Sequence, residues 1–71
     1  MKYYLNKNRQ QNGDYEVHVQ GCAYGALPEN QIQLGEFANC AGAVTRAKQQ
    51  YPDVANHING CYFCCQPCHT S

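Results

Sequence analysis

The chain has 71 residues with six cysteines, no Trp and two Phe, and its five basic side chains balance five acidic ones. This charge balance argues against binding nucleic acid through its phosphates, and no apolar run is long enough to span a bilayer. Only about 60% of the surface of so short an unfolded chain can be buried, so we expect a metal or disulfides to staple the fold.

The first segment predicts a β-hairpin over residues 2–20. "KYYLN" and "DYEVHVQ" are rich in Tyr and Val, and they alternate with a period of two. Asn12 and Gly13, between them, tolerate the positive φ angles of a hairpin turn. Alternation places Val17 on the core face and His18 on the opposite face, which we expect to be polar.

A third strand is predicted over residues 31–37, from "QIQLGEF". Ile32 and Leu34 share one face of it, and Phe37 is out of phase with them. Gly35 is the expected position of a bulge that corrects the phase. The chain then runs into "NCAGAVTRAKQQY", which has the spacing of a helix.

We predict this helix over residues 39–51. The Asn39 side chain can accept a hydrogen bond from a free backbone N–H, as an N-cap does, and Pro52 ends the helix. Cys40 begins its apolar stripe, so we expect Cys40 to be a small core residue. "PDVANHIN" is interpreted as a loop, with an Asn59-Gly60 turn that delivers Cys61.

The fold class predicted from these elements is α+β in a single domain, residues 1–71. It combines a small three-stranded antiparallel sheet, one packed helix and a Cys-rich C-terminal knuckle over residues 60–71.

Two pairs of side chains have the spacing of metal ligands. His18 precedes Cys22 by four residues, and Cys61-x-x-Cys64 is typical of a zinc knuckle, in which backbone N–H groups stabilise two thiolates. We therefore predict a tetrahedral zinc site made by His18, Cys22, Cys61 and Cys64. The register of the tail stays open, and the alternative ligands are Cys65, Cys68 and His69. If unused, Cys65 and Cys68 are expected near the surface as reactive thiols or a reversible disulfide.

These motifs carry a resemblance to known proteins. "HVQGC", then "LGEF" and a Cys/Ala-rich helix, then "NGCYFC" resemble small bacterial zinc-binding modules across residues 15–68. The metal-binding domain of Ada-type DNA-repair proteins is related in shape. The chain as a whole is similar to small bacterial proteins without an assigned activity. The resemblance implies a fold and the same four zinc ligands but no substrate. The extra "CQPCH" and the shortage of basic residues depart from it and argue against a DNA-repair role.

Three functions remain open on the sequence. The first is a structural zinc module that binds another protein, is monomeric and has no catalytic activity. The second is a thiol redox or soft-metal-handling protein, because Cys64 and Cys65 are vicinal and two C-x-x-C pairs overlap. The third is a disulfide-stapled secreted domain. "MKYYLNKNRQQNGD" has no apolar core of a secretory signal, which predicts a cytoplasmic protein unless Met1 replaces a removed leader.

Overall fold

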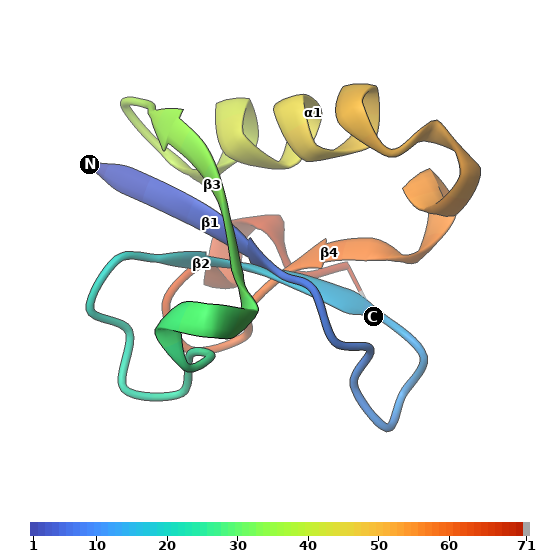
Figure 1. The fold of residues 1–71 in the computed structure, drawn as a ribbon. Coiled ribbons are helices and arrows are strands. Elements are labelled where there is room, and N and C mark those ends of the chain that lie inside the picture. The colour runs from blue at the N-terminus through green and yellow to red at the C-terminus, as the bar shows by residue number, and fades with distance from the viewer. Residues whose placement is uncertain (71) are drawn as a thin grey trace.

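Four strands form one mixed sheet in residues 1–70, the part of the chain that the computed structural model describes. The strand order is β3-β1-β2-β4, and a single α-helix crosses one face of the sheet (Figure 1). The elements are β1 (Lys2–Asn6), β2 (Tyr15–Val19), β3 (Gln31–Glu36), α1 (Cys40–Gln50) and β4 (Ile58–Gly60). Short 3-10 helices span Pro28–Asn30, Pro52–His57 and Gln66–Cys68. The α+β class is therefore confirmed.

The predicted hairpin and third strand are present. β1 pairs antiparallel with β2, with Tyr4 opposite His18, and on its other side β1 pairs antiparallel with β3. The register between β1 and β3 shifts beside Gly35, whose φ is 111°. Residues with a side chain rarely adopt such a φ. The predicted bulge is thus confirmed, and it keeps Leu34 buried under the helix.

The fourth strand was not predicted, and it makes the sheet mixed instead of antiparallel. β4 pairs parallel with β2, with Ile58 opposite Tyr15 and Gly60 opposite Val17. The predicted turn at Asn59-Gly60 is therefore wrong, and the segment interpreted as a loop holds a 3-10 helix and this strand. Asn and Gly disfavour strands, so only the long-range pairing with β2 makes this one extended.

α1 covers the face of the sheet that carries the main core. Its first turn is capped as expected, because the Asn39 side chain accepts a hydrogen bond of 3.0 Å from the backbone N–H of Ala41. Ala43 and Ala47 are fully buried and let the helix lie close to the strands. The helix occupies nearly the predicted range, 39–51, and Pro52 starts the following 3-10 helix.

The other face of the sheet is also covered, which the sequence interpretation missed. Tyr4 and His18 point to this side and are 1% and 0% exposed. The segment between β2 and β3 runs along the side of the sheet opposite α1 (Figure 1). The backbone N–H of Ala26, in this segment, donates a 2.9 Å hydrogen bond to the Tyr4 hydroxyl. The face carries polar side chains as expected, but His18 is buried on it.

A disulfide joins the helix to the C-terminal segment. Cys40, at the start of α1, is bonded to Cys68, with 6.4 Å between their Cα atoms. Cys40 is buried as expected, but the prediction that it serves only as a core residue is wrong. No helix within residues 1–70 has the length and apolarity to cross a bilayer.

Candidate metal centre

The structure brings together the four side chains that the sequence singles out as metal ligands. One ligand atom from each of His18, Cys22, Cys61 and Cys64 lies within 4.8 Å of all the others. His18 and Cys61 are buried, while Cys22 and Cys64 are partly exposed. A group of three thiols and one imidazole at this spacing could hold a metal ion.

The C-terminal pair is positioned by the edge of β2. Beyond Gly60 the chain continues along β2, and the backbone N–H of Cys61 donates a 2.9 Å hydrogen bond to the carbonyl of Val17. Two residues further along β2, the N–H of Val19 donates to Cys64 Sγ at 3.4 Å. This N–H···S bond stabilises a Cys64 thiolate, and the main-chain bond of Cys61 fixes the start of the C-x-x-C knuckle against β2.

Cys22 lies just after β2, beyond a tight turn at Gly21. Gly21 has a φ of 92°, and the N–H of Cys22 donates a 3.0 Å hydrogen bond back to the carbonyl of Val19. A residue with a side chain would be strained at that φ, so Gly21 permits the reversal that returns Cys22 to His18. Both halves of the cluster are therefore held by main-chain hydrogen bonds to the last residues of one strand.

One sulfur–nitrogen distance in the cluster matches that of a tetrahedral zinc ion. Zn–S bonds near 2.3 Å and Zn–N bonds near 2.05 Å put neighbouring S and N ligands about 3.6 Å apart. Cys64 Sγ and His18 Nδ1 are separated by 3.7 Å. This contact indicates Nδ1 as the coordinating nitrogen, and a donor set of three thiolates and one imidazole is one that structural zinc sites use.

The electrostatics of the cluster favour a cation at its centre. Burial, reinforced by the neighbouring Cys22 thiol, raises the pKa of the Cys64 thiol far above its usual range. Burial also lowers the pKa of His18, so its imidazole is neutral at pH 7, the form that binds metals. Thiolates gathered in a buried place repel one another, and a divalent ion removes that repulsion and deprotonates its ligands.

The alternative ligands lie outside this group. Cys65 is free but only 1% exposed, so the expectation of a surface thiol there is wrong. Cys68 is bonded to Cys40, so the expectation of a reactive thiol at Cys68 is wrong. His69 directs Nδ1 at the carbonyl oxygen of Gly60, 3.0 Å away.

Aromatic rings gather on the two loops that carry the ligands. Tyr24 lies two residues after Cys22 and stacks on Phe63, with 3.9 Å between ring centroids and 19° between ring planes. Tyr62 meets Phe63 edge-on at 5.3 Å. All three side chains are more than half exposed. We call Tyr24, Tyr62 and Phe63 the aromatic cluster.

A cavity of about 390 Å³ opens at the other end of the sheet, near Tyr15. Its wall is mostly apolar and includes Leu5, Ile32 and Val54 beside the end of α1. It contains none of the His and Cys side chains, so the metal cluster is the stronger candidate for a functional centre.

Comparison of the chain with protein-family models, with curated proteins and with solved structures finds no match. The resemblance to Ada-type zinc modules therefore stays a prediction from the motifs. What the chain does must be inferred from the geometry of its own His/Cys cluster.

Proposed function

We propose that this chain is a small zinc-binding module with a structural role, without catalytic activity of its own, that binds another protein. The observation that carries the proposal is the convergence of four metal donors within 4.8 Å, from two segments far apart in the sequence. Three thiols and an imidazole favour zinc over magnesium or calcium, which prefer oxygen ligands.

A structural role follows from the number of donors. Four protein ligands fill a tetrahedral ion, leaving no position at which water or a substrate could bind. Zinc held in this way would tie the hairpin end at residues 18–22 to the knuckle at residues 61–64. Its binding free energy would then contribute directly to folding, which a core this small needs.

The aromatic cluster supports a protein partner. Exposed aromatic side chains are enriched where proteins meet, and here three of them lie on loops that the ion would fix. Residues 21–27 and 60–70 contain no Lys, Arg, Asp or Glu. Such an uncharged surface suits apolar protein side chains better than phosphates, which need nearby cations.

The Cys40–Cys68 bond favours a second candidate function, a disulfide-stapled domain of an oxidising compartment. The two candidates differ in what holds residues 61–64 in place. In the second, the bond at Cys68 does so and the four-donor cluster stays metal-free; in the first, zinc occupies the cluster whether or not the bond is formed.

Intact mass under native and denaturing conditions, with metal analysis of protein purified under reducing conditions, tests the proposal. We expect one zinc per chain in the wild type and in the Cys65→Ser control, which alters a buried thiol outside the cluster. Cys61→Ser and Cys64→Ser should bind none. Metal-free wild-type protein would contradict the proposal. Zinc loss in Cys65→Ser alone would mean that Cys65, and not Cys61 or Cys64, is a ligand.

A further inference from the structure

The imidazole of His18 has two nitrogens, and the four-donor cluster uses only one of them. Nδ1 faces Cys64 Sγ at 3.7 Å, whereas Nε2 is buried and makes no hydrogen bond within residues 1–70. A neutral imidazole that offers Nδ1 to a metal must carry its proton on Nε2. That N–H then needs an acceptor, because a buried donor left unpaired costs about 1–3 kcal/mol.

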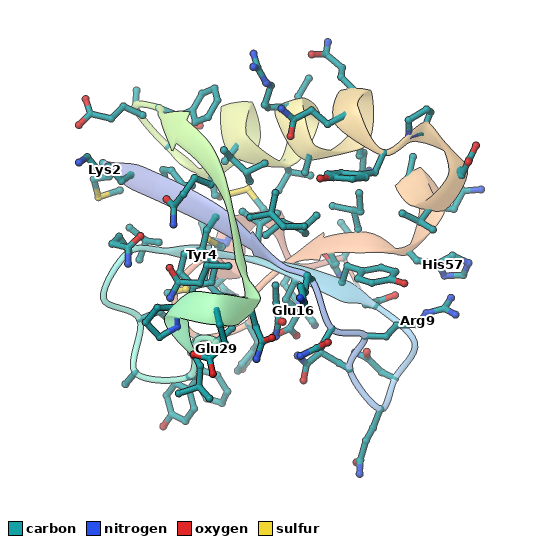
Figure 2. The ribbon with its side chains drawn as sticks, in the orientation of Figure 1. Lys2, Tyr4, Arg9, Glu16, Glu29 and His57 are labelled. Atoms are coloured by element: carbon teal, nitrogen blue, oxygen red, sulfur yellow. A yellow bond between two sulfur atoms is a disulfide. The ribbon has the colours of Figure 1, made fainter. Side chains whose placement is uncertain are left out.

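One carboxylate lies in the right place to accept this proton. Glu16 is two residues before His18 on β2, so both side chains point to the same face, the side away from α1 on which Figure 2 shows Glu16 and Tyr4. Glu16 Oε1 is 3.7 Å from His18 Nε2, and the Glu16 side chain is only 18% exposed. A movement of about 0.8 Å would bring the pair to the distance of a charge-assisted hydrogen bond.

The other neighbour of the ring does not fill this role. Tyr4 lies opposite His18 on β1, with 5.3 Å between ring centroids and 33° between ring planes, so it packs against the flat face of the imidazole. Its hydroxyl accepts a hydrogen bond from the N–H of Ala26. Packing by Tyr4 holds the plane of the ring, but it leaves open which nitrogen carries the proton.

We propose that Glu16 is a positioning residue of the metal centre, whose carboxylate accepts the Nε2–H of His18 and so keeps Nδ1 unprotonated and aimed at the three thiols. This inference rests on the proposed zinc-binding function. It gives the Glu16 carboxylate a role in setting metal affinity. Mutating the group that accepts a hydrogen bond from a metal-binding His typically lowers metal affinity about 10- to 100-fold.

Glu16→Ala, Glu16→Gln and, as a matched control, Glu29→Ala test the proposal. Glu29 is exposed in the 3-10 helix before β3, apart from Glu16 in Figure 2. Zinc affinity is measured by competition with a chromophoric chelator. We expect a 10- to 100-fold loss in Glu16→Ala, and less than about a threefold change in Glu29→Ala. Glu16→Gln keeps an oxygen that can accept from Nε2, so it should restore most of the affinity.

The tautomer of His18 gives a readout that a purely structural effect would not move. Long-range ¹H–¹⁵N NMR of the zinc-free protein should show the proton on Nε2 in the wild type and a mixture of tautomers in Glu16→Ala. If Glu16→Ala does not fold by circular dichroism, Glu16→Leu keeps the bulk without an acceptor and is judged by the same two criteria.

Unchanged affinity and an unchanged tautomer in the variant without an acceptor would overturn the role of Glu16. So would a loss of affinity as large in Glu16→Gln as in Glu16→Ala. Wild-type protein that binds no zinc would instead refute the proposed function, so the two failures are distinguishable.

Discussion

Removing the disulfide should produce a large and calculable loss of stability. The bond joins Cys40 to Cys68 across 28 residues of chain. The entropy of closing such a loop in the unfolded state corresponds to about 3.6 kcal/mol at 25 °C. A chain of 71 residues is stable by roughly 4–11 kcal/mol in total, so the double variant Cys40→Ala/Cys68→Ala should lose a third or more of its free energy of unfolding.

Urea unfolding followed by circular dichroism, with free zinc held constant by a metal buffer, measures this loss. With an m value of about 1 kcal/mol/M, the midpoint should fall by roughly 3.5 M. The m value itself should rise, because the unfolded chain exposes more surface once the loop is open. Wild-type protein kept reduced should behave like the double variant.

Cys65→Ala is the control, because it removes a buried sulfur from the same region without opening a loop. It should cost only about 1 kcal/mol for the lost packing. A double variant that loses no more than this control, with an unchanged m value, would refute the reasoning. It would mean that the unfolded chain is already held compact without the bond.

Three further changes have expected outcomes. In metal-free protein the urea midpoint should fall as pH drops below 6.5, since burial lowers the pKa of His18. It should also fall as pH rises above 9, since burial raises the pKa of Cys64. A midpoint that does not change with pH contradicts this. Gly60→Ala should cost about 1–3 kcal/mol, because a Cβ there would lie 2.7–3.1 Å from Cys65 and Cys68 atoms, and an unchanged melting temperature would show that they move aside. Tyr4→Phe should lose about 1–3 kcal/mol in urea by unpairing a backbone N–H, and no loss would mean that water replaces the hydroxyl.

The local parts of the fold could be predicted from the sequence because local chemistry determines them. Asn39 caps the helix and Gly35 marks the bulge through the conformations of single residues. The His18–Cys22 and Cys61–Cys64 spacings are likewise short-range patterns, so the four members of the cluster could be named in advance. Its identity as a zinc site stays a prediction.

The missed features depend on contacts between distant segments. β4 is extended because it pairs with β2, and its own residues, Asn59 and Gly60, favour a turn. Alternation correctly put His18 on the face opposite Val17, but it could not show that residues 20–30 would cover that face. The Cys40–Cys68 pairing was equally hidden, since six cysteines allow 15 connectivities and metal binding competes with all of them.

The parallel pairing of β2 with β4 has a consequence for how fast the chain folds. The β1–β2 hairpin closes over the loop of residues 7–14. The β2–β4 ladder must bring Tyr15 and Ile58 together across most of the chain, and such pairings form slowly. Each half of the donor cluster is local and can capture an ion before the two halves meet. Zinc would then bridge the gap early, so stopped-flow refolding should be faster with zinc present than in chelator. Equal rates would place ion capture after the ladder has formed.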